Sequence, residues 1–504
     1  MPQSISDSKV LPLDVCGSSI YGRSPKIQSA RTYNMIIADG WLVDYFGYKN
    51  KAVISEYLGR GIFGSVFENV IITVYGNKVY RVRIFNDPVD TENSTYLWHQ
   101  IGEIETYYGD IFIDENITHQ IAICDKKNLY IYNTVTNSFD KVFFSSDFVP
   151  GYIKYQNGSF AAPNVIGSNW ALSDPTNALN WYWGSSGKMV SGEFQTKPDR
   201  PVAIVRGPGK SGIFYIIGNS VTEIWSHQPT PRQFPYIKSS SSNIDYGCVN
   251  PATVAALDNV IVWLAQNEKS GPFIVYTTGS DVQEISTDGL NYKLSQLNNP
   301  QKSSAFLMKL SGHLIYQLTF YDERDNFSIA YDFTTQKLYD VSDENMNKHI
   351  TRQLDFFNNS YYFVSYNDGN LYEARADLFT YDYGVGINSS QVFEIPRIRI
   401  CENIRTPKQD VFIIRNVTFT LEQGTDKYNL EANEVYQPRI ALRLSKDGGY
   451  VYGQDISIPL NIYGKRTSKL NWWDLGAAND LTIQIRFYGK GSFRATNGEV
   501  EAYI

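Results

Sequence analysis

The sequence predicts an all-β protein, and three observations lead to this fold class. Aromatic residues are abundant, with 37 Tyr, 27 Phe and 9 Trp in 504 residues. Such side chains fit the pleated faces of strands. Short runs of alternating apolar residues separated by polar turns follow one another along most of the chain, and these units recur at a regular spacing.

The repeating unit is a pair of strands joined by a polar turn, as in NVIITVYGNKVYRVRIFN at residues 69–86. Seven such units occur, and they begin near Asn69, His119, Gly151, Ser211, Asn259, Gly312 and Gln353. The mean step of roughly 47 residues is typical of one four-stranded propeller blade. We therefore expect a β-propeller of about six to eight blades, because radial repetition protects strand edges.

The pattern changes after about Gly386, where longer strands such as DVFIIRNVTFTLEQ and DLTIQIRFYG appear. We expect a C-terminal β-sandwich at 387–504 after a propeller at 51–386. The segment 1–50 is less regular, and we expect it to close the ring or to join the sandwich.

Charge and composition exclude several function classes. The net charge of −7 and the absence of Lys or Arg runs disfavour tight nucleic-acid binding. The first residues, MPQSISDSKVLPLDV, do not resemble a secretory signal, and no window is apolar enough to span a membrane. We expect a protein without membrane insertion, made and retained in a cytoplasm, with Cys16, Cys124, Cys248 and Cys401 as free thiols.

One short stretch, Ser445-Lys446-Asp447-Gly448-Gly449, has three possible interpretations. A calcium loop needs about six to eight oxygen ligands, whereas Asp447 stands alone. A sialidase Asp box would repeat across the propeller, and no second copy occurs there. We therefore predict a tight hairpin turn between apolar runs, with glycines at positive φ.

Two glycine-rich segments resemble nucleotide-binding motifs. Residues Gly59–Val66 match G-x-G-x-x-G, but a strand follows where a phosphate site needs a helix. No D-F-G or H-R-D accompanies them as a kinase would require. In Gly207–Ser211 the first glycine of a P-loop is replaced by Ile204. We predict a glycine-rich turn for the first segment and a loop between blades for the second.

No catalytic, cofactor-binding or metal-binding residues are predicted. The five histidines lack ligand spacing, and no G-x-S-x-G elbow occurs. The 52 acidic residues leave a carboxylate-pair glycosidase open, because only geometry selects such a pair. Six tryptophans could stack on sugars, although core packing is the more common role of this side chain: Trp170, Trp181, Trp183, Trp225, Trp472 and Trp473.

Several stretches, in their order and spacing, resemble the packaged-DNA stabilisation proteins, or tail accessory factors, of short-tailed bacteriophages. They are TYNM at 32–35, GNSVTEIW at 218–225 followed by FPY at 234–236, NPATVAALDNVIVWLA at 250–265, GPFIVYTTGSDVQEIST at 271–287, and the closing run from SKDGGYVYGQD at 445–455 to IYGKRTSKLNWWDLGAANDLTIQIRFYG at 462–489.

The resemblance implies a non-enzymatic structural protein of the virion tail that assembles as a homohexamer below the portal and its adaptor ring. It would extend the DNA channel, retain packaged DNA as lumen cargo, and dock a tail needle, nozzle, or tail-spike or fibre proteins. The family has no catalytic residues to transfer. Two alternatives from other classes stay open: a tail-borne, sialidase-like glycan-degrading enzyme and a glycan-binding propeller.

Overall fold

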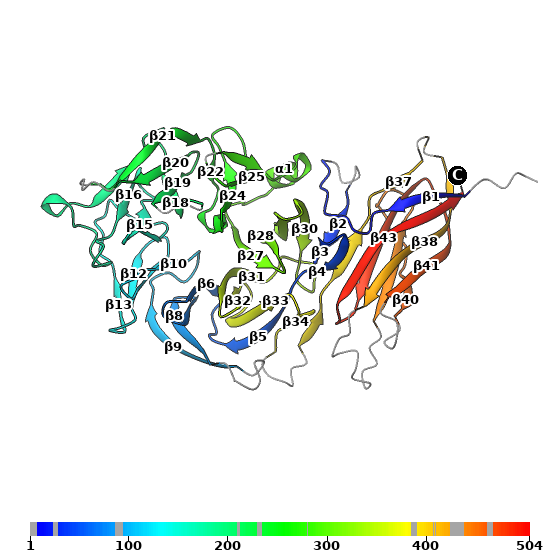
Figure 1. Ribbon diagram of the computed structural model, residues 1–504, viewed down its shortest axis with the longest axis horizontal. Coiled ribbons are helices and arrows are strands. Elements are labelled where there is room, and N and C mark those ends of the chain that lie inside the picture. Colours follow the sequence, from blue (N-terminus) through cyan, green and yellow to red (C-terminus); the bar gives the residue numbers. More distant parts are fainter. Residues whose placement is uncertain are drawn as a thin grey trace, which may run out of the picture.

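A computed structural model describes residues 8–23, 29–85, 94–208, 212–228, 234–279, 281–384, 391–406, 408, 410–423, 438–460 and 467–503. The fold is all-β, as predicted: a β-propeller stands beside a β-sandwich (Figure 1). The one α-helix of the described residues is α1, Asp288–Ser295. No described helix combines the length and apolar character that a membrane crossing requires.

Seven antiparallel sheets form the blades of the propeller, within the predicted range of six to eight. The first four blades have the following strands: β6 (Gly59–Ser65), β7 (Val70–Tyr75), β8 (Lys78–Phe85) and β9 (Thr95–Glu103); β10 (Phe112–Glu115), β11 (Gln120–Cys124), β12 (Leu129–Asn133) and β13 (Ser138–Lys141); β14 (Lys154–Gln156), β15 (Ser159–Pro163), β16 (Asn169–Leu172) and β17 (Val190–Glu193); β18 (Pro201–Arg206), β19 (Ile213–Gly218), β20 (Thr222–His227) and β21 (Tyr236–Ile244).

The remaining three blades are less uniform. Their strands are β22 (Gly247–Cys248), β23 (Ala255–Leu257), β24 (Val260–Gln266), β25 (Phe273–Thr277) and β26 (Val282–Glu284); β27 (Ser303–Leu310), β28 (His313–Tyr321), β29 (Asn326–Asp332) and β30 (Lys337–Val341); β31 (Thr351–Phe357), β32 (Ser360–Ser365), β33 (Asn370–Arg375) and β5 (Gly47–Val53), with β34 (Thr380–Asp382) and β35 (Val392–Glu394) beyond β5.

The blades form a closed ring around a central axis. Neighbouring blades contact one another in chain order, and β31 of the last blade contacts β6 of the first. The outer strand of the last blade comes from the start of the chain, because β5 pairs antiparallel with β33. Strands such as β7 are buried on every residue, since stacked blades cover both faces of each sheet. Their continuous apolar sequences follow from this burial.

The β-sandwich is built from both ends of the chain. One sheet has the order β3-β4-β43-β38-β41, with β1 also on β43, and the other continues through β36, β42, β39 and β40, with β37 on β42. The strands of the first sheet are β1 (Ser8–Leu13), β3 (Met35–Ala38), β4 (Trp41–Asp44), β38 (Phe412–Gln423), β41 (Thr467–Ala478) and β43 (Phe493–Tyr503). Those of the second sheet are β36 (Arg397–Ile400), β37 (Ile404–Arg405), β39 (Arg439–Ser445), β40 (Ile456–Pro459) and β42 (Asp480–Tyr488). In Figure 1, β1 lies beside β43 near the C-terminus.

Propeller and sandwich share one continuous ten-stranded sheet. The strand β2 (Arg31–Tyr33) pairs parallel with β30 of the sixth blade and antiparallel with β36 of the sandwich. A single apolar cluster includes buried residues of both parts, among them Tyr339 and Phe412. The division of the chain at residues 50 and 386 stays a prediction: β5 runs across residue 50, and residue 386 lies outside the described residues.

Two fully buried arginines of β36 fix the N-terminal segment in place. Arg397 forms an ion pair with Asp44 and donates to the carbonyl oxygens of Gly489 at 2.7 Å and Phe379 at 3.0 Å. Arg399 donates to the carbonyl oxygens of Asp14 at 2.9 Å and Ser18 at 2.9 Å. Because each guanidinium has several acceptors, burial leaves its charge compensated.

Candidate functional site

The segment Gly59–Val66 is not a glycine-rich turn, so that prediction is wrong. Residues 59–65 form β6, the innermost strand of the first blade. A Cβ atom on Gly61 would lie 2.8 Å from Cβ of Ile111, so glycine is needed here for the close approach of the next blade. Close packing of inner strands, rather than phosphate binding, explains this glycine spacing.

Arg60, between two of these glycines, has a structural role that the sequence analysis missed. It is buried, and its guanidinium donates to the carbonyl oxygens of Gly76 at 2.7 Å and Tyr108 at 2.6 Å. Burial, together with the neighbouring positive charge of Arg352, lowers the pKa of Arg60 to about 10. A charged residue inside an otherwise small and apolar strand is the signal that could have marked it.

The stretch 445–449 reverses the chain between β39 and β40, which pair antiparallel. Gly448 and Gly449 have φ of 76° and 92°, as predicted. Asp447 accepts from the backbone N–H groups of Tyr450 and Val451, both at 3.1 Å. The connection is longer than the expected tight hairpin, because β40 begins only at Ile456. The described residues hold no group of three or more His, Cys, Asp or Glu side chains suited to a metal ion.

The other sequence candidates lie mostly in the core or in loops. Residues 209–211 of the P-loop-like segment lie outside the described residues, and the chain enters β19 at Ile213. All four cysteines are free thiols, as predicted, and all four are buried. Trp170, Trp181, Trp225 and Trp472 are buried in the core, Trp183 is partly buried, and Trp473 is 56% exposed.

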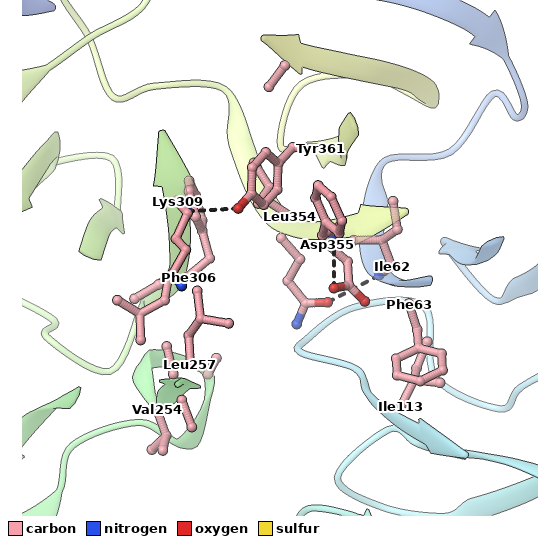
Figure 2. Close-up of a pocket in the computed structure, with 18 of the residues that line it drawn as sticks. Ile62, Phe63, Ile113, Val254, Leu257, Phe306, Lys309, Leu354, Asp355 and Tyr361 are labelled. Carbon is pink, nitrogen blue, oxygen red and sulfur yellow. Dashed lines mark hydrogen bonds between the residues drawn. The ribbon is translucent and has the colours of Figure 1, made fainter. Parts of the chain in front are cut away.

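One cavity among the described residues lies on the propeller axis and has a volume of about 940 Å³. Its walls come from inner strands of six blades, and Figure 2 shows Val254, Leu257 and Phe306 across the cavity from Phe63 and Ile113. Asp355 on β31 also lines it. Burial raises the pKa of Asp355 to about 6, although two backbone N–H groups donate to the carboxylate.

Most ionisable side chains of this cavity are paired. Lys309 lies 2.6 Å from Asp258, and Lys154 lies 3.2 Å from Asp114. Two carboxylates arranged around a sugar-sized gap would be expected for a glycosidase. Here Asp258 is paired with Lys309 and Asp377 with Arg375, which leaves Asp355 as the lining acid without an ion pair among the described residues. The sequence analysis did not single out Asp355, and only its position in the apolar run QLDFF distinguished it.

The seven-bladed ring and the sandwich joined to it define the class of the protein by its fold, a β-propeller protein with an attached β-sandwich. The chain belongs to the phage stabilisation family, whose model is described as Bacteriophage P22 Gp10, β-propeller, and matches residues 28–337. It is therefore a bacteriophage protein of the DNA-stabilisation type, which confirms the family resemblance. No curated protein matches the chain.

Similarities to solved structures are weak. A catalytically inactive virginiamycin B lyase from Staphylococcus aureus, solved with quinupristin, is 12% identical, with a TM-score of 0.41, over 66% of this chain and 99% of that chain. The N-terminal domain of Nup159 is 12% identical, with a TM-score of 0.40, over 66% of this chain and 95% of that chain. No function is transferred from either protein.

Proposed function

We propose that this protein is a non-enzymatic structural component of a phage tail that forms a homohexameric ring below the portal and its adaptor. The ring extends the DNA channel, retains the packaged genome and docks the tail needle, nozzle, or spike or fibre proteins. The observation that carries the proposal is the family match over residues 28–337. The glycan-directed alternative is not favoured, because the family is a structural one and most of the tryptophans considered for sugar stacking are buried.

The architecture suits a building block for such a ring. The propeller closes on itself, so its own stability needs no second copy, and a ring must use dedicated surfaces. The shared ten-stranded sheet holds the sandwich in a fixed position beside the propeller. The net charge of −7 favours a lumen that does not retain passing phosphates.

The outer face of the sandwich offers two exposed apolar side chains, Trp473 and Val10, for assembly. Four residues form a row across neighbouring strands of this sheet. In order, they are Trp473 on β41, Asn416 on β38, Glu501 on β43 and Val10 on β1. Trp473 is 56% exposed and Val10 is 60% exposed. Exposed tryptophans are enriched at the energetically important positions of protein interfaces, and we assign the row that contains Trp473 to the contact between neighbouring copies.

The decisive experiment compares phage particles with and without the protein. We expect particles that lack it to fill with DNA and then lose it, measured as DNA protected from nuclease over time after packaging. Purified protein should bind duplex DNA weakly at physiological salt and form a ring on the adaptor, measured by native mass spectrometry. Particles that keep their genomes and fail only in receptor binding or capsule degradation would overturn the stabilisation role.

The assembly surface has its own test. Trp473→Glu should prevent ring formation while the melting temperature stays near that of the parent protein, because this side chain is mostly exposed. Lys469→Glu, also on β41 and also exposed, is the matched control and should assemble normally. Normal rings from the Trp473 variant would remove this surface from the proposal but leave the role in DNA retention intact.

A further inference from the structure

The axial cavity has the dimensions of a ligand site. Its volume of about 940 Å³ lies within the range of small-molecule pockets, roughly 300–1,000 Å³. Much of its wall is apolar, formed by Ile62, Ile113, Val254, Leu257 and Phe306. Such a wall favours the apolar part of a ligand by the hydrophobic effect.

The charged side chains on the cavity wall differ in whether they form ion pairs. The Lys309–Asp258 and Lys154–Asp114 pairs are described above, and the third pair joins Arg375 to Asp377. Asp355 is different: its carboxylate accepts from the backbone N–H groups of Gly64 and Phe356, each at 2.8 Å, and no cationic side chain of the described residues forms an ion pair with it.

The surroundings of Asp355 favour a cation and disfavour an anion. Asp114 raises its pKa in addition to burial, whereas Lys154 acts in the opposite direction. Both lysines that line the cavity already have carboxylate partners: Lys309 pairs with Asp258, and Lys154 pairs with Asp114, which Arg206 also contacts at 3.2 Å. A metal ion lacks the necessary ligands, since no group of three donor side chains occurs among the described residues.

We propose that the axial cavity binds an organic cation, in which an ammonium or guanidinium group pairs with Asp355 and an apolar body packs against Ile62, Ile113, Val254 and Leu257. The bound cation would form a charge-assisted hydrogen bond with the carboxylate. It would also offset the unfavourable burial of the negative charge. The cation can belong to a free amine or to a basic side chain of a short peptide, because both present the same chemistry to the cavity.

Three probes with the same apolar body and different charges test this site on the full chain by calorimetry: hexylamine, 1-hexanol and hexanoate. We expect hexylamine to bind at least tenfold more tightly than hexanol, and hexanoate more weakly than either. In Asp355→Asn the preference for the amine should disappear, whereas Ser360→Ala, at a neutral residue that lines the same cavity, should retain it. Equal binding of amine and alcohol by the parent protein, or an unchanged preference in Asp355→Asn, would overturn the proposal.

The pH dependence gives a test on the unmodified protein, should the Asp355 variant fail to fold. Because the cation pairs with the ionised carboxylate, and the pKa of Asp355 is about 6, affinity for hexylamine should be about tenfold lower at pH 5 than at pH 7. Affinity for hexanol should not change in this way. Identical pH profiles for the two probes would contradict a role for Asp355.

A second arm separates the two sources of the cation. A capped pentapeptide with one lysine among valines and leucines is compared with the same peptide containing norleucine in place of the lysine. If the lysine peptide binds more tightly than both the norleucine peptide and hexylamine, the ligand is a peptide. If hexylamine binds more tightly than the lysine peptide, the ligand is a free amine. Lysine-independent binding of the peptide together with no binding of hexylamine would refute the site. These measurements use isolated protein, so their failure leaves the proposed role in DNA retention untouched.

Discussion

His349 should make the stability of this protein depend on pH in a defined window. The imidazole is fully buried among aromatic rings, with ring centroids 5.2 Å from Phe46 and 5.6 Å from Tyr48. Its Nδ1 accepts from the backbone N–H of Thr351 at 3.4 Å, and Nε2 has no hydrogen-bond partner among the described residues. Burial alone lowers the pKa of His349 from 6.5 to about 3, because the charged form is poorly solvated there.

The sign and size of the effect follow from this pKa. The pKa of the His349 imidazole is 6.5 in the unfolded chain and about 3 in the folded protein, so between these values only the unfolded chain binds the proton. The contribution to stability is therefore fully present above pH 6.5 and is lost as the pH falls toward 3. Each pKa unit corresponds to about 1.4 kcal/mol, so the loss between pH 7 and pH 5 is about 2 kcal/mol.

The assay compares the parent protein with His349→Gln in denaturant unfolding at pH 7 and pH 5. The variant loses packing and is less stable at pH 7, but the gap between the two proteins should narrow by about 2 kcal/mol at pH 5. Acids with raised pKa values, such as Asp355, titrate equally in both proteins and cancel. Phe412→Leu provides the control: it removes buried apolar volume without changing an ionisable group, so its loss of stability should be the same at both pH values. A gap of the same size at both pH values would refute the reasoning.

Three further substitutions test the packing described above by thermal or denaturant unfolding. Gly61→Ala should destabilise the propeller by about 1–3 kcal/mol through overpacking. Gly279→Ala is the control and should change stability by less than about 0.5 kcal/mol, because no described atom lies within 4 Å of the added Cβ. Equal effects of the two substitutions would contradict the close approach of the blades. Gly448→Val should cost about 1–3 kcal/mol because of its positive φ, and calcium or a chelator should leave the melting temperature unchanged; a calcium-dependent shift of several degrees would restore the ion-site interpretation. Arg397→Met should cost about 3–5 kcal/mol by leaving Asp44 buried without its partner, and adding Asp44→Asn should recover part of this loss; no recovery would show that the ion pair is not the cause.

The repeat could be recognised in the sequence because the middle strands of each blade have a distinctive apolar pattern. These strands, such as β7 with VIITVY and β24 with VIVWLAQ, are apolar on both faces because neighbouring blades cover them. The inner strands were harder to recognise. In β6 glycines replace the expected large residues, since the blades approach most closely at the axis. A local sequence pattern indicates which residues are buried. It does not indicate how closely neighbouring blades approach one another at the axis, because that distance depends on the whole ring.

The junction between propeller and sandwich had no signal in the sequence. It depends on the pairing of Tyr33 with Asp340, two residues about 300 positions apart, and parallel pairing carries no turn motif. The axial cavity was equally hidden, because its lining residues come from six blades and only the closed ring brings them together. Individual residues could be excluded as metal ligands or nucleophiles from spacing alone, but a convergent site could not be assembled that way.

The pairing of strands far apart in sequence has a consequence for how the protein is made. Strands β1 to β5 are synthesised well before the strands they pair with, because β5 pairs with β33, and β1 and β4 pair with β43. The earlier strands therefore lack these partners while the propeller and most of the sandwich are synthesised. Contacts of such long sequence separation slow folding and prolong the exposure of unpaired edges. Yield in the host should therefore depend on keeping β1 to β5 from aggregating until β33 and β43 have been synthesised, and a chain truncated before β43 should accumulate as insoluble material.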